Sequence, residues 1–328
     1  MCRGQRCGAA QVRRYATDGF TMSARNTSGP SFLAITLALA LALVGACRSP
    51  DSSTDPGQND DAADSNGSEP IVYDDCVLSS GNGTVPDELR TRGRVNTTSD
   101  FGRFTKSLQV YGITLVAQDD VSNGFLEAVA SSIVEIFPDA VESPEEQAEI
   151  LRALYRYRAV IPVFAGGERG IDEGAIESIQ GSASLCDIIM LDVPERQAME
   201  VVEHVLHIVS DVGLHHAYPE RWGMTTGSEL FVSRNAARDE GAYDTSSYGD
   251  IDEAPIRQRV ELQEYAYWVI TTYWDLQSAY GPTEREWTAR TPTELEQRVP
   301  SAYSLVESTV GRTMAAPSTA TMDALEGW

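Results

Sequence analysis

The sequence predicts an α+β fold, with a small mixed sheet and packed helices followed by a mainly helical C-terminal subdomain. Strand and helix patterns follow one another in the order β-α-α-β-β-α between residues 105 and 211. Beyond residue 228 the patterns are mostly helical. A hydrophobic content of 42% is enough for a sizeable core.

The first two elements differ in their apolar spacing. Residues 105–117 are rich in β-branched and apolar side chains, which predicts a strand. From Asp120 the apolar residues recur every four positions, which predicts an amphipathic helix that ends at Pro138. These apolar residues are Phe125, Val129, Ile133 and Phe137.

A second helix has a clear predicted start. Ser143 is its expected N-cap, Pro144 occupies the first helical position, and Glu146 completes a capping box. The helix is expected to end near Arg158. We then predict a buried strand, a glycine-rich loop and a third strand at residues 159–166, 165–184 and 185–192.

The next helix carries the histidines. We predict that it spans residues 193–211 and stops at Gly213, a typical residue just beyond a helix C-terminus. Three further helices are predicted at residues 228–240, 254–281 and 294–309.

The N-terminal part indicates export. Residues 32–46 form an apolar run of signal-peptide length, so we predict a signal peptide over residues 1–46. The run ends in Val-Gly-Ala-Cys, which resembles the lipobox of bacterial lipoproteins and implies lipidation of Cys47. The alternative is a chance cysteine after an ordinary signal peptide. Met22 begins a more normal signal sequence, so we interpret Met22 as the true translation start and residues 1–21 as lying upstream of it.

A polar stretch follows the lipobox. Residues 47–70 are rich in Asp, Ser, Gly and Pro, and they have too few apolar groups to offset the entropy lost on ordering. We expect a disordered tether from the lipid to a single domain over residues 71–328. The expected location is the cell envelope, outside the cytoplasm and lipid-anchored to the membrane.

Two cysteines remain in the expected mature domain, Cys76 and Cys186. An even pair in an oxidising compartment predicts a disulfide, and two separate buried thiols are the alternative. The formal net charge is −24, and the only lysine is Lys106. A chain this acidic has no phosphate-binding footprint, so nucleic acid is excluded as an expected partner.

All four histidines lie within thirteen residues, at positions 204, 207, 215 and 216. Glu203 and His207 are four apart on the predicted helix and therefore share one face. A carboxylate and an imidazole one turn apart suit a transition metal, zinc above all. The alternative is the solvated face of an amphipathic helix.

A third metal ligand is expected from another segment. Glu264 lies in the apolar and aromatic run LQEYAYWVI, where an unpaired buried carboxylate would be costly. A metal shared with Glu203 and His207 is one partner that would offset this cost. The alternative places Glu264 at the solvent beside Glu261 and Arg257.

Together these features resemble the gluzincin group of zincin metallopeptidases, over roughly residues 105–310. The family motif H-E-x-x-H supplies two zinc ligands and a general base. Here the five positions are Glu-His-Val-Leu-His, with the first two residues exchanged. By position, the resemblance implies Glu203, His207 and Glu264 as zinc ligands and His204 as the catalytic base.

The zincin resemblance also implies an oxyanion-stabilising tyrosine, for which Tyr248, Tyr265 and Tyr267 are candidates. It implies a metal-dependent hydrolase, a metallopeptidase whose substrate is polypeptide, and the lipobox implies that this hydrolase is tethered to the membrane. One alternative is a catalytically inactive lipoprotein that binds metal or a partner on the same scaffold. Another is a structural lipoprotein without metal. His215 and His216 follow the expected helix end, where they are either loop residues or extra ligands.

Overall fold

The computed structural model describes residues 76–193, 196–282 and 285–328. The predicted signal peptide over residues 1–46, the lipidation site Cys47 and the tether over residues 47–70 lie outside the described residues. Within the described part of the chain, no helix is both long enough and apolar enough to span a membrane.

Four short strands form the sheet, in the spatial order β1-β2-β3-β4. Strands β1 and β2 are antiparallel, whereas β3 lies parallel to both β2 and β4. The predicted small mixed sheet is therefore confirmed. The strands are Lys106–Val110, Ile113–Ala117, Ala159–Phe164 and Ile189–Met190.

Two strand predictions were wrong in their extent. Residues 105–117 form a hairpin and not one strand, because Tyr111 and Gly112 both have positive φ angles, 49° and 88°. Two successive positive φ values match a tight hairpin turn that suits the twist of paired strands. The strand predicted over residues 185–192 is paired only at Ile189 and Met190.

Helix α2 (Asn123–Ile136) contacts β1, and α3 (Pro144–Arg156) contacts residues 209–214. Their positions agree with the predicted spacing and proline signals. Ser143, however, makes no capping hydrogen bond with its side chain, so the predicted capping box is absent. The segment predicted as a loop over residues 165–184 contains a short helix, α4 (Glu173–Glu177), capped by Asp172.

The histidine helix is longer than predicted. Helix α5 (Gln197–Ile208) continues through a π-helical segment, Val209–Leu214, into α6 (His215–Ala217). Gly213 was predicted to end the helix, but it lies inside the π-helical segment. A Cβ at Gly213 would meet the Ile150 side chain of α3 at 2.8 Å, so glycine here permits close helix packing.

The remaining chain is mainly helical, as predicted. Two predicted helices are each divided: Asp275, with a φ of 60°, separates α9 from α10, and Pro300 starts a new helix after α11. A proline inside a helix removes a backbone donor and clashes with the preceding turn. The helices are α7 (Pro219–Trp222), α8 (Glu229–Asp239), α9 (Ala254–Tyr273), α10 (Leu276–Ala279), α11 (Pro292–Arg298), α12 (Pro300–Glu307), α13 (Val310–Thr313) and α14 (Thr319–Glu326).

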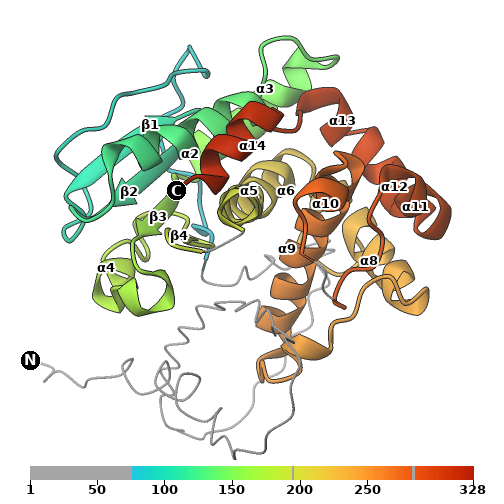
Figure 1. Ribbon diagram of the computed structural model, residues 1–328. Coiled ribbons are helices and arrows are strands. Elements are labelled where there is room, and N and C mark those ends of the chain that lie inside the picture. Colours follow the sequence, from blue (N-terminus) through green and yellow to red (C-terminus); the bar gives the residue numbers. More distant parts are fainter. Residues whose placement is uncertain (1–75, 194–195, 283–284) are drawn as a thin grey trace, which may run out of the picture.

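Helix α5 occupies the centre of the described structure. It contacts β3 and β4 on one side and α9 on another, so it joins the sheet to the helical part (Figure 1). The C-terminal helix α14 contacts both α2 and α5. The predicted disulfide between Cys76 and Cys186 is present, and it links the start of the described chain to the segment before β4.

Candidate metal centre

The polar residues of α5 lie in the protein interior. Glu203, His204 and His207 expose only 6%, 8% and 1% of their surface. The valines on the other side of the helix, Val201 and Val205, are buried as well. A helix that is buried all round belongs to the core, so the alternative of a solvated helix face is wrong.

Glu264 faces α5 from α9. Its exposed fraction is 4%, so the alternative in which it points to solvent is also wrong. One donor atom each from Glu203, His207 and Glu264 lies within 4.8 Å of the others, and His207 Nε2 is 3.5 Å from Glu264 Oε2. The structure therefore brings together the three residues that were expected as ligands. We call these three residues the metal centre.

Two donor atoms of the metal centre lack hydrogen bonds. Neither His207 Nε2 nor Glu264 Oε2 forms a hydrogen bond with any residue that the structure describes, although both atoms are buried. Buried polar atoms are nearly always hydrogen-bonded, because an unpaired one costs about 1–3 kcal/mol. A cation between the two atoms would satisfy both at once.

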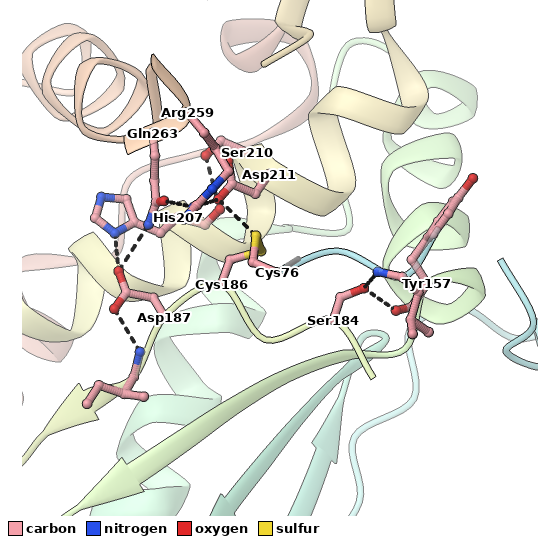
Figure 2. The surroundings of a disulfide bond; sticks show 12 residues. Cys76, Tyr157, Ser184, Cys186, Asp187, His207, Ser210, Asp211, Arg259 and Gln263 are labelled. Atoms are coloured by element: carbon pink, nitrogen blue, oxygen red, sulfur yellow. Dashed lines mark hydrogen bonds and ion pairs between the residues drawn. A yellow bond between two sulfur atoms is a disulfide. The ribbon is translucent and has the colours of Figure 1, made fainter. Parts of the chain in front are cut away.

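Asp187 lies on the other side of the His207 ring. Its Oδ2 atom is 2.5 Å from His207 Nδ1 and also accepts a hydrogen bond from Gln263 Nε2 at 3.1 Å (Figure 2). When Nδ1 donates to this carboxylate, Nε2 of a neutral ring is left as the lone-pair donor. Metal-binding histidines are commonly oriented by a carboxylate in this way.

The charges of the metal centre also favour a cation. Burial and the nearby Glu264 carboxylate raise the pKa of Glu203 to about 8. For His207, burial opposes the charged form, but the carboxylates of Glu264 and Asp187 raise its pKa to about 10. The centre thus retains protons at neutral pH in the absence of metal. A divalent cation would replace those protons as the positive partner.

His204 lies between two carboxylates. Its Nδ1 atom forms an ion pair with Asp187 Oδ2 at 2.9 Å, and its Nε2 atom forms one with Glu200 Oε1 at 3.0 Å. Burial disfavours the charged ring, yet these two carboxylates raise the pKa of His204 well above its usual value. Asp187 conversely has a pKa held well below its usual value by His204 and His207, against the effect of burial.

His215 and His216 lie outside the metal centre. His215 Nδ1 accepts a hydrogen bond from the Met224 backbone N–H at 3.1 Å, and the His216 ring stacks on Tyr157 with centroids 3.5 Å apart. Burial lowers the pKa of His215 to about 3 and that of His216 to about 4. Neither belongs to a group of clustered metal-binding side chains among the described residues.

The three candidate tyrosines lie in different places. The Tyr267 ring packs edge-on against His207, with centroids 6.0 Å apart. Tyr265 hydrogen-bonds Ser233 through its hydroxyl at 2.7 Å, and the hydroxyl of Tyr248 donates to Glu286. Of the three, Tyr267 is the one whose ring contacts a residue of the metal centre.

Sequence reasoning missed the residues that surround the centre. Asp187, Glu200 and Gln263 contact the inner histidines, but none of them was identified as a functional candidate. Asp187 directly follows the disulfide cysteine Cys186. This adjacency was visible in the sequence, but it did not show that the carboxylate faces the histidine helix.

The donor set fits a transition metal. One imidazole nitrogen and two carboxylate oxygens suit zinc, whereas calcium and magnesium sites are built from oxygen donors. Comparisons of the chain with protein-family models, curated proteins and solved structures find no match. The function is therefore inferred from the residues of the site.

Proposed function

We propose that this protein is a zinc-dependent hydrolase of the metallopeptidase type, acting on polypeptide outside the cytoplasmic membrane. The observation that carries the proposal is the convergence of Glu203, His207 and Glu264, with His207 Nε2 and Glu264 Oε2 both buried, without a hydrogen bond, and facing each other as an ion pair at 3.5 Å. The resemblance of the motif to the zincins supports the reaction class. Lipid on Cys47 would tether the protein to the membrane.

Three residues would hold the zinc. Glu203 and Glu264 would contribute two negative charges, and His207 would bind through Nε2 while Asp187 accepts its Nδ1 proton. Two carboxylates balance the charge of a divalent ion in a buried site, where an unbalanced charge is costly. When bound, zinc supplies a Lewis acid and lowers the pKa of a water bound to it.

The role of His204 follows from its partners. Its ring lies between Asp187 and Glu200 and has a raised pKa, so it carries a proton at neutral pH. A general base must be unprotonated before it accepts a proton from water. The base role implied by the motif position is therefore disfavoured, and a proton-donating or carboxylate-holding role fits the contacts better.

The same observation favours a second candidate function. A lipoprotein that binds zinc on this scaffold without turnover needs no general base. The protonated His204 would then be a permanent counter-charge for Asp187 and Glu200. The two candidates share the metal centre and differ only in whether peptide bonds are cleaved.

Metal analysis and a cleavage assay together separate these functions. Purified protein should contain about one zinc per chain, and His207→Ala should remove it, whereas His216→Ala on the same continuous helix should retain it. Zinc binding with chelator-sensitive cleavage of casein supports the hydrolase. Zinc binding without cleavage supports the second candidate. Absence of zinc and of other transition metals in the wild type contradicts both.

A further inference from the structure

A buried polar network connects the disulfide to the metal centre. Cys186 is joined to Cys76 by the disulfide and is followed directly by Asp187, whose Oδ2 atom contacts His207 Nδ1 (Figure 2). The disulfide is buried, with the two cysteines 8% and 4% exposed. A covalent bond thus lies one residue away from the carboxylate that orients a proposed zinc ligand.

A second path reaches Asp187 from α9. Gln263 Nε2 donates to Asp187 Oδ2 at 3.1 Å, and Arg259 Nη1 donates to Gln263 Oε1 at 2.6 Å. The same Arg259 atom is 3.4 Å from Asp211 Oδ2, and Asp211 Oδ2 lies 4.0 Å from Cys76 Sγ. The hydrogen bonds and ion pairs therefore end at Asp211, which contacts the disulfide without a hydrogen bond because a disulfide sulfur has no proton to donate. Asp187 is thus held by the covalent link to Cys186 and by Gln263.

The backbone around Asp187 is irregular, so the neighbouring disulfide contributes to holding it in place. Asp187 lies on an irregular segment between Ser184, which bridges to β3, and the short strand β4. It belongs to none of the sheet ladders. Its Oδ1 atom accepts the backbone N–H of Ile188 at 2.8 Å, which fixes the side chain relative to its own backbone. The position of the Asp187 carboxylate therefore follows the position of this segment.

We propose that Asp187 is a positioning residue of the metal centre and that the Cys76–Cys186 disulfide holds it in place. Loss of the disulfide would release the segment, weaken the contact between Asp187 and His207, and reduce the affinity for zinc. This inference rests on the proposed metal centre. A change in the partners of a metal-binding histidine typically costs about 10- to 100-fold in metal affinity.

The test compares zinc affinities of folded variants by competition with a chromophoric chelator. Asp187→Asn and the double variant Cys76→Ser/Cys186→Ser should each bind zinc about 10- to 100-fold more weakly than the wild type. Both should also change the visible absorption spectrum of the cobalt-substituted protein, because His207 approaches the ion differently. Circular dichroism at the assay temperature verifies that each variant is folded.

A destabilised control separates positioning from stability. Loss of a disulfide destabilises the folded state, and Ile133→Ala should do so as well because it leaves a cavity in the buried core of α2. Ile133→Ala should leave the zinc affinity and the cobalt spectrum unchanged. If Asp187→Asn binds zinc like the wild type, the positioning role of Asp187 is overturned. If the double serine variant does so, the role of the disulfide is overturned, and in both cases the proposed function stands. If the wild type binds no zinc, both are overturned.

Discussion

Two pairs of histidines on one continuous helical stretch have opposite electrostatic environments. The inner pair, His204 and His207, is surrounded by carboxylates that raise both pKa values. The outer pair, His215 and His216, has lowered pKa values because burial disfavours the charged ring, and the neighbouring His216 and Arg156 charges act in the same direction. Residue type and helix are shared, so the difference lies in the partners that the fold supplies.

The segment between the two pairs has its own geometry. Val209–Leu214 is π-helical, which adds a residue to the turn and changes the direction of every side chain beyond it. The inner pair, which precedes this segment, faces Asp187 and α9, while His216, which follows it, faces Tyr157. Segments of this kind often occur at functional sites.

The largest expected contrast between the pairs is in zinc affinity. His207→Ala and Glu264→Ala should each lower it by more than the ~10- to 100-fold typical of a residue that only orients a ligand. His215→Ala and His216→Ala should change it less than about twofold, because neither approaches the metal centre. Isothermal titration with zinc measures all four. Equal losses of zinc affinity in the inner and outer variants would contradict the assignment of zinc binding to the inner pair.

Zinc affinity should also rise steeply with pH. Glu203, with a pKa of about 8, and His207, with a pKa of about 10, must each lose a proton before they bind metal. Each proton released strengthens binding by about tenfold per pH unit below its pKa. We expect a gain of roughly 10- to 100-fold per unit from pH 6 to pH 8. Competition titrations test this, and an affinity independent of pH would contradict the protonated inner site.

Glu203→Gln should have opposite effects on the stability of the folded protein with and without metal. The folded-state pKa of about 8 exceeds the ordinary 4.5, so the folded state binds more protons and stability falls as pH rises through this interval. In chelator at pH 8 the variant should be more stable by on the order of 2–4 kcal/mol, because Gln stays neutral. With zinc it should be less stable than the wild type.

Urea denaturation at pH 5 and pH 8 measures this effect, and Glu307→Gln on the exposed surface of α12 is the matched control. The control should show no such pH-dependent gain. A Glu203→Gln variant that is destabilised in chelator at pH 8 would argue against repulsion between the two buried carboxylates.

His215 of the outer pair should make the folded state less stable at low pH, by a smaller amount than the Glu203 effect. His215 has a folded-state pKa of about 3 against an ordinary 6.5, so the unfolded state binds the proton first and stability falls below pH 6.5. At pH 5 this amounts to about 2 kcal/mol relative to pH 8. His215→Gln should remove this part of the acid sensitivity in urea denaturation. An unchanged pH profile would show that His215 is protonated in the fold.

The sequence predicted the metal-centre grouping because helical spacing is local. A spacing of four places Glu203 and His207 on one face, and the apolar run around Glu264 indicated a buried carboxylate in need of a partner. The disulfide was predicted from the even number of cysteines in the mature domain and from the expected oxidising compartment. The small mixed sheet followed from the order of strand and helix patterns, although the hairpin at Tyr111 and Gly112 was missed.

The features that the sequence did not predict depend on contacts between distant segments. Gly213 was expected to end the helix, but it permits contact with Ile150 of α3, which no local pattern shows. Burial lowers the pKa of His204, and Asp187 and Glu200 together raise it well above its usual value; Asp187 approaches from the segment before β4. The motif indicates that His204 belongs to the site, whereas its protonation state depends on residues that only the tertiary fold brings near it.

Crystallographic data from protein grown with zinc, collected at the zinc absorption edge, test the central claim most directly. We predict one anomalous peak per chain, about 2.0–2.2 Å from His207 Nε2 and from carboxylate oxygens of Glu203 and Glu264. The same crystals of His207→Ala should lack this peak. A fully occupied peak beside His215 and His216, or no peak in the wild type, would contradict the assignment of the metal centre.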